Sequence, residues 1–315
     1  MNLGKKSLEE FRVLGAKLLE HMSWKDLAAV LFPPAMGIDV LSGLMSDTPV
    51  EDNGFDPEYP EAALLDAVLD VSKWLSVNYF TTSILGTEHV PKDGPVLLAG
   101  NHSAGLMPLD ALFAMNELRE SGMETPVHPL VHDFAYTAPR VAGSARRLGI
   151  LRAKRENALA ALRAGRHVLV YPGGDEDAFR TFSERKQVIL AGRKGFIRLA
   201  MTAKVPIVPL VSVGLQESFI VLTKGRSIGR KLGIKKWLRT EIFPISLSLP
   251  WGLGPAFTPF LPLPCSIDMR FLPPVHVEGS PDDDAAVGAA YDRILNAMQD
   301  AMDEINRDRV PFFGR

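Results

Sequence analysis

The sequence of 315 residues contains a single cysteine, Cys265. One thiol excludes an intrachain disulfide and a zinc site built on cysteine ligands. His128 and His132 have a spacing that metal ligands use on a helix, but they fall on an expected strand without a well-placed third ligand, so no metal site is expected. The sequence also lacks a phosphate-binding P-loop and a dinucleotide-binding glycine fingerprint. Finally, 35 Lys and Arg residues are balanced by 37 Asp and Glu residues, so the overall charge gives no reason to expect nucleic acid as a partner.

An uninterrupted transmembrane helix is the next feature that the sequence lacks. The segment 27–45 is mostly apolar, but Pro33, Pro34 and Asp39 interrupt it. The segment 242–267 has no charged residue and is long enough to span a bilayer, yet it contains six prolines. Each proline costs ~3 kcal/mol inside a helix, so we expect an irregular segment that packs on the protein or lies at a membrane interface. The charged, amphipathic N-terminus is unlike a secretory signal peptide.

The rest of the composition is typical of a folded protein, with 46% hydrophobic and 23% charged residues. Residues 1–80 show apolar positions at helical spacing, which predicts a helical region packed on the domain that follows. In residues 81–315 strands alternate with helices, which predicts an α/β domain with a largely parallel sheet flanked by helices. The expected strands are 95–99, 127–131, 167–171, 207–213 and 267–272, and the expected helices are 8–22, 24–31, 61–78, 108–119, 157–164, 192–203 and 281–305.

A histidine follows the first expected strand of this domain. The chain runs from that strand into Asn101-His102-Ser103, and Asp110 opens the next helix. A histidine at a strand end with a carboxylate nearby suits general-base catalysis, because the carboxylate holds the tautomer and stabilises the imidazolium. The alternative interpretation is a loop histidine that only caps a helix. Ser103 is not expected to be a hydrolase nucleophile, because Asn101 stands where the nucleophile elbow needs a glycine.

The segment from Asn101-His102 to Asp110 resembles the first motif of the phospholipid/glycerol acyltransferase superfamily, of the lysophosphatidate acyltransferase type. Three further segments, 149–155, 170–174 and 205–209, resemble the second, third and fourth motifs of that family in the same order. Together they cover roughly residues 86–214, and the stretches around the second and third motifs are similar to one bacterial branch of the superfamily.

The resemblance implies an O-acyltransferase of lipid metabolism, acting in phospholipid biosynthesis. Such an enzyme moves a fatty acyl group from an acyl thioester, acyl-CoA or acyl carrier protein, to a glycerolipid hydroxyl such as that of lysophosphatidate. His102 is then the general base and Asp110 orients it, with no cofactor besides the thioester co-substrate. The residues that the resemblance assigns to substrate binding are Asn101, Arg155, Tyr171, Pro172, Gly173 and Gly174. Arg180, just beyond the third motif, is a further candidate that could replace the family's arginine.

Two departures from the family pattern bear on the mechanism and the acceptor. Asp110 follows His102 by eight residues, a longer spacing than is usual in the family, so a loop has to return it to the histidine. Gly173 stands where the family has a glutamate that helps hold the acceptor, and the acidic residues 175–177 fall where it has an arginine. Arg155 is then the best remaining anion ligand, unless it is an ordinary surface arginine. A neutral acceptor (diacylglycerol or another alcohol) and a non-catalytic lipid-binding protein on the same scaffold are the alternatives.

A basic run precedes the uncharged segment. Residues 224–239 contain seven Lys and Arg residues and no acid, and a tryptophan lies among them. Cations beside tryptophan and apolar loops are typical of a surface that binds anionic lipid, so we expect a cytoplasmic protein associated peripherally with the membrane. A solvated loop is the alternative, and the apolar neighbour disfavours nucleic acid. The expected membrane contacts are Arg230, Lys231, Lys235, Lys236, Trp237 and Trp251.

Overall fold

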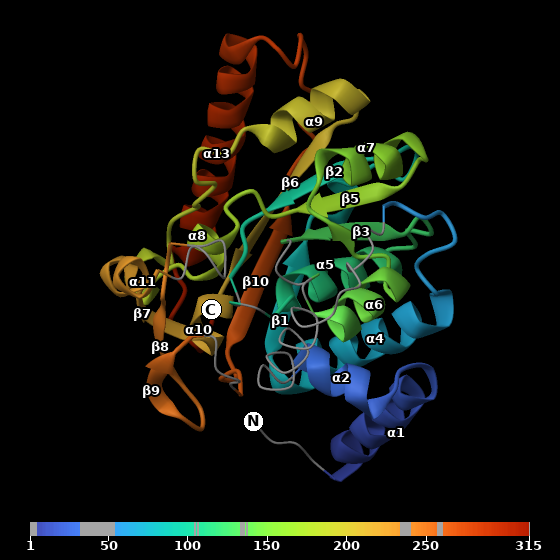
Figure 1. Cartoon of the computed structure of the whole chain (residues 1–315), viewed down its shortest axis with the longest axis vertical. Helices are drawn as coiled ribbons and strands as arrows, with labels where there is room; N and C mark the ends of the chain where they lie inside the picture. The colour runs from blue at the N-terminus through green and yellow to red at the C-terminus, as the bar shows by residue number, and fades with distance from the viewer. Residues whose placement is uncertain are drawn as a thin grey trace.

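The computed structural model describes residues 5–31, 54–103, 105, 107–132, 136, 138–233, 241–256 and 261–314. Its centre is a seven-stranded sheet in the order β1-β10-β6-β2-β5-β3-β4 (Figure 1). The strands are β1 (Thr81–Leu85), β2 (Leu97–Gly100), β3 (Val127–Val131), β4 (Leu151–Arg152), β5 (His167–Val170), β6 (Ile207–Val213) and β10 (Ser266–Phe271). All neighbours pair in parallel except β10 and β6, which are antiparallel. This arrangement confirms the α/β fold with a largely parallel sheet.

Helices cover both faces of this sheet. Every residue of β2 and β6 is buried, as expected of central strands with a helical layer on each side. Successive residues of β2 point to opposite faces, so Leu97 packs in one core cluster and Leu98 in the other. The helices of the Leu97 cluster are α7 (Arg155–Arg163), α9 (Gly195–Ala203) and α13 (Asp284–Asn306), and those of the Leu98 cluster are α4 (Ala62–Trp74) and α5 (Leu109–Glu120).

The N-terminal helices pack beside the Leu98 layer. They are α1 (Lys5–His21) and α2 (Trp24–Leu31), which contact α4 and α6 (Pro139–Arg147) respectively. Leu18 and Met22 form a small core cluster with Leu64 and Ala67 of α4. The helix expected over 61–78 ends as an α-helix at Trp74 and continues as one π-helical turn, Leu75–Tyr79. Within the described ranges no helix is long and apolar enough to cross a membrane, and most of the segment 27–45 lies outside them.

A second, three-stranded antiparallel sheet lies beside the main one, at the lower left of Figure 1. It consists of β7 (Ile220–Thr223), β8 (Ile245–Ser248) and β9 (Gly252–Pro255), and two short helices flank β7: α10 (Leu215–Ser218) and α11 (Arg226–Leu232). The expectation of an irregular segment over 242–267 was therefore wrong for its first half. The prolines permit strands here because Pro244 precedes β8, Pro250 lies between the strands and Pro255 ends β9.

Candidate active site

The structure brings His102 and Asp110 together at the carboxyl end of β2. His102 follows β2 by two residues, Asp110 lies in the first turn of α5, and the Nδ1 atom of His102 is 2.6 Å from Asp110 Oδ2. The backbone N–H groups of Ser103 and Ala111 also donate to Asp110, at 3.1 and 2.9 Å. The Asp110 side chain is fully buried, whereas that of His102 keeps 17% of its surface exposed. The carboxylate is thus held in place beneath a histidine that solvent or substrate can reach.

This pairing sets the chemistry of the imidazole. An ionised Asp110 accepts the Nδ1–H, so the neutral tautomer carries its free lone pair on Nε2. Burial lowers the pKa of His102, but the charge of Asp110, its hydrogen bond and the charge of Asp177 outweigh that effect and raise the pKa above its ordinary value. The imidazolium that forms when Nε2 takes a proton is therefore stabilised inside the site.

A buried ion pair between Asp177 and Arg180 binds the His102 loop. The helix α8 (Asp175–Ala178) places Asp177 so that one carboxylate oxygen accepts the backbone N–H of His102 at 2.5 Å. Its other oxygen lies 3.3 Å from Arg180 Nη1, and Arg180 Nη2 donates to Ser103 Oγ at 3.0 Å. Burial raises the pKa of Asp177 to about 6 even though Arg180 and the N–H of His102 act to lower it. Sequence reasoning missed Asp177, for which the only signal was the run of acids after the third motif.

Two of the residues assigned to substrate binding, Asn101 and Arg180, are buried beside His102 and bind neighbouring segments of the protein. Asn101 is buried and exchanges two hydrogen bonds of 2.8 Å with the backbone of Ser212 in β6, which fastens β2 to β6 just before the histidine. Arg180 has 1% of its surface exposed and is bound to Ser103, Asp177 and the carbonyl of Gln187. These contacts favour a supporting role for both side chains, and their contact with substrate stays a prediction.

Tyr171 lies beside the imidazole. The ring centroids of His102 and Tyr171 are 4.9 Å apart and the rings are tilted by 33°. Gly100 allows this approach, because a Cβ at that position would lie 2.7 Å from Tyr171 Cε1. Burial and the charge of Asp110 raise the pKa of Tyr171 well above its ordinary value, so the phenol is neutral at physiological pH.

The turn after Pro172 leaves no space for a side chain at its first glycine. A Cβ on Gly173 would lie 2.0 Å from the carbonyl oxygen of Ile189 and 2.4 Å from Cβ of Asp177. The family's glutamate therefore has no room at this position in the observed backbone. The N–H of Gly174 donates within the turn to the carbonyl of Tyr171 at 3.1 Å, so it is already engaged and is not a free donor for an oxyanion.

The other assigned residues lie apart from His102. Arg155 begins α7 shortly after β4, and its exposed guanidinium donates to Thr202 at 3.0 Å. In the sheet order β5 and β3 lie between β4 and β2, the strand that leads to His102. Of the expected membrane contacts, Arg230 and Lys231 are exposed on α11 and Trp251 is exposed at the β8–β9 turn. The remaining three, Lys235, Lys236 and Trp237, lie outside the described residues.

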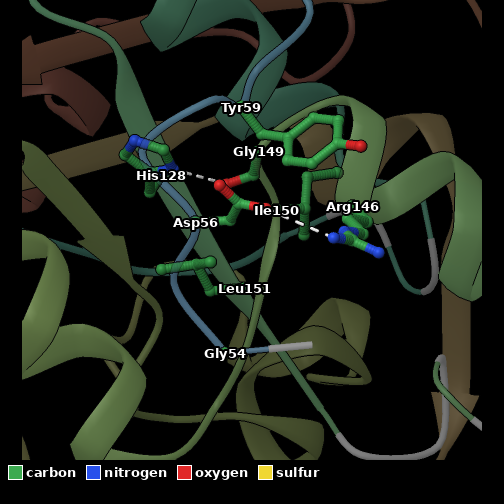
Figure 2. A pocket seen from close by; sticks show the side chains of 8 residues that line it. All are labelled: Gly54, Asp56, Tyr59, His128, Arg146, Gly149, Ile150 and Leu151. Atoms are coloured by element: carbon green, nitrogen blue, oxygen red, sulfur yellow. Dashed lines mark hydrogen bonds and ion pairs between the residues drawn. The ribbon is translucent and has the colours of Figure 1, made fainter. Parts of the chain in front are cut away.

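Figure 2 shows His128 among the residues that line a separate small pocket. Its Nδ1 lies 2.7 Å from the carbonyl of Gly149, and the cavity between His128, Tyr59 and Arg146 has a volume of about 10 Å³, room for one water at most. Burial lowers the pKa of His128. In the described part of the chain, no group of three or more His, Cys, Asp or Glu residues is arranged to hold a metal ion.

Comparison with known proteins points to one family. Residues 82–213 match the model of the acyltransferase domain family. The chain is 30% identical over 216 residues to an uncharacterised protein of Mycobacterium tuberculosis, which covers 67% of this chain and 58% of that protein. It is 28% identical over 221 residues to diacylglycerol O-acyltransferase 1 of Saccharomyces cerevisiae, covering 66% and 52%. A solved structure, the 1-acyl-sn-glycerophosphate acyltransferase PlsC of Thermotoga maritima, aligns with a TM-score of 0.48 and 14% identity over 92% of this chain and 96% of that one.

The matched residues include the whole histidine–aspartate site and the strands that carry it. Residues 82–213 carry an acyltransferase domain, as the order of the four motifs implied. The alignments with the mycobacterial and yeast relatives span 58% and 52% of the length of those proteins.

Proposed function

We propose that the protein transfers a fatty acyl group from an acyl thioester, acyl-CoA or acyl carrier protein, to a hydroxyl of a glycerolipid. The observation that carries this proposal is the contact of 2.6 Å between His102 and a fully buried Asp110, within residues that match an acyltransferase domain. The same contact speaks against a lipid-binding protein without catalysis, because a buried carboxylate aimed at a reachable histidine serves no purpose in holding a lipid chain.

In the proposed reaction, His102 Nε2 takes the proton of the acceptor hydroxyl while the hydroxyl oxygen attacks the thioester carbonyl. Asp110 stabilises the imidazolium that results. The tetrahedral intermediate then collapses with cleavage of the carbon–sulfur bond, and the imidazolium returns the proton to the leaving thiolate. The products are the ester and a free thiol, and the histidine is restored without a covalent acyl-enzyme.

The surroundings of the third motif support a neutral acceptor, such as diacylglycerol, over a phosphorylated one. Cations close to this turn are already paired with its acids: Arg193 with Asp175 at 2.8 Å, and Lys224 and Arg226 with Glu176 at 3.3 and 2.7 Å. Arg180 is buried and the position of the family glutamate is closed. The name of the yeast relative, a diacylglycerol O-acyltransferase, is in line with this choice.

Lysophosphatidate is the second candidate acceptor, and the exposed guanidinium of Arg155 is the observation that favours it. An arginine can grip a phosphate through two parallel hydrogen bonds. Since the acceptor is a membrane lipid in either case, we also propose that the protein works at the cytoplasmic membrane surface as a peripheral protein.

An acceptor panel tests the proposal. Purified protein is incubated with labelled acyl-CoA, or with acyl carrier protein as donor, and with diacylglycerol, lysophosphatidate or a long-chain alcohol, and the products are separated by thin-layer chromatography. We expect labelled triacylglycerol that depends on His102. Arg155→Ala should leave the reaction with diacylglycerol unchanged if the acceptor is neutral, and should raise KM selectively for lysophosphatidate if it is not. Absence of transfer with every donor and acceptor would overturn the proposed activity.

A further inference from the structure

The outer face of the three-stranded sheet is apolar and uncovered in the described part of the chain. Six large hydrophobic side chains on and beside its strands are between 46% and 68% exposed: Leu222, Leu247, Leu249, Trp251, Leu253 and Leu261. A soluble antiparallel sheet ordinarily turns polar residues to water on its open face. A gathered apolar patch of this kind marks an interaction site.

The register of the strands puts four of these side chains on one surface. Leu247 of β8 is paired directly with Leu253 of β9, and Leu249 pairs with Leu261 in an isolated bridge. Ser246 and Ser248, on either side of Leu247 in β8, are buried on the opposite face. Because side chains alternate along a strand, the exposed leucines form a continuous apolar surface across neighbouring strands and not scattered single residues.

The inner face of the same sheet packs against the candidate active site. Val221 of β7 lies in a core cluster with Phe219, Ala178 and Phe179, and the last two belong to the segment that follows the third motif. Phe219 also contacts the His102 loop, since a Cβ on Gly105 would lie 2.8 Å from its ring. The apolar outer face is therefore fixed to the body of the protein close to His102.

The charges around this face distinguish between its potential partners. Residues 242–267 contain no charged side chain, whereas the adjoining α11 exposes Arg226, Arg230 and Lys231, and the exposed Ile228 lies among them. Arg226 is paired with Glu176, whereas the ion pairs among the described residues include neither Arg230 nor Lys231. An apolar surface with a cationic border suits an anionic bilayer and would repel a second copy of itself.

We propose that the outer face of β7–β8–β9, bordered by α11, docks on an anionic lipid membrane (Figure 1). The leucines and Trp251 enter the interface between headgroups and acyl chains while Arg230 and Lys231 bind lipid phosphates. This orientation turns the sheet that contacts the His102 loop toward the membrane. Vesicle binding needs no catalysis, so the docking proposal can fail while the proposed acyl transfer stands. Acyl transfer can likewise fail while docking stands.

The test is co-sedimentation of the full chain with vesicles of phosphatidylglycerol and phosphatidylcholine, and with vesicles of phosphatidylcholine alone. The triple variant Leu247→Gln/Trp251→Gln/Leu253→Gln should have an affinity for vesicles at least about tenfold lower than the wild type, because three apolar insertions are lost. Arg230→Gln/Lys231→Gln should weaken the preference for anionic vesicles and reduce the salt dependence, while retaining some binding. The matched control is Leu85→Gln on β1, an exposed leucine at the edge of the main sheet, which should bind like the wild type.

Circular dichroism and a thermal melt verify that each variant is folded, and an emission shift of Trp251 gives a second measurement. The fluorescence change on vesicle addition, and its quenching by brominated lipid, should shrink in Trp251→Phe. Equal vesicle binding of the triple variant and the wild type would overturn the proposal. Loss of binding in Val13→Gln, at an exposed position of α1, would overturn it as well if the triple variant still binds. A wild-type dimer in light scattering that the triple variant abolishes, without any change in vesicle binding, would assign this face to a second copy instead.

Discussion

His102 Nδ1 lies 2.6 Å from Asp110 Oδ2 although the two residues are eight positions apart. The contact does not depend on a fixed loop length, because β2 and α5 both pack in the Leu98 cluster of the core and hold the two ends of the loop. A longer loop can thus preserve the pair as long as the strand end and the first turn of the helix stay where they are.

Loss of the base should abolish most of the acyl transfer. We expect His102→Ala to lower kcat by roughly 10²–10⁴, the usual reach of a general base. Asp110→Asn should also be impaired, because the amide removes the charge that stabilises the imidazolium. Steady-state rates with labelled acyl-CoA are the measurement, and circular dichroism controls for folding. A folded His102→Ala protein with the rate of the wild type would rule out this role.

The pH profile should report the environment of the same histidine. The base acts in its neutral form, so kcat/KM falls as pH drops through the pKa of His102, which is raised above 6.5 by Asp110 and Asp177 against the effect of burial. We therefore expect the acid limb above pH 6.5 in the wild type. In Asp110→Asn the limb should move to lower pH, because burial still lowers the pKa and the largest opposing charge is gone. A limb that stays in place in this variant would contradict the assignment.

Asp177 should matter for stability far more than its neighbour Asp175. Replacing Asp177 by Ala leaves buried Arg180 and the N–H of His102 without their partner, which should cost about 3–5 kcal/mol in the free energy of unfolding. Asp175 pairs with a half-exposed Arg193, so Asp175→Ala should cost ~1 kcal/mol or less. Urea unfolding of both variants measures the contrast, and equal losses would show that the buried pair does not hold the His102 loop.

The residues that could be predicted from the sequence are those with a local signature. Central strands such as β6 are largely apolar runs, and the motif around His102 stands at a strand end, so the fold class and the proximity of His102 and Asp110 could be predicted. Asn101 lies within the first motif and Arg180 just beyond the third, which suggested substrate contact, yet their hydrogen bonds to Ser212 and Ser103 depend on strands and loops far apart in the chain. The β8–β9 pair was missed because its prolines indicate irregular structure. Only the pairing of Leu247 with Leu253 shows that these prolines lie at the ends of strands.

The closed position at Gly173 yields a prediction that bears on the acceptor. Gly173→Ala should cost about 1–3 kcal/mol in the free energy of unfolding, because its Cβ would collide with the carbonyl of Ile189 and with Asp177, and the turn has to move. Movement of Asp177 disturbs the His102 loop, so the rate of acyl transfer should fall as well. Gly143→Ala is the matched control: that glycine lies inside α6 with no atom within 4 Å of an added Cβ, and alanine there should stabilise by up to about 1 kcal/mol. If Gly173→Ala or Gly173→Glu has the free energy of unfolding and the rate of acyl transfer of the wild type, the turn has room for the family's glutamate. The structural argument for a neutral acceptor then fails.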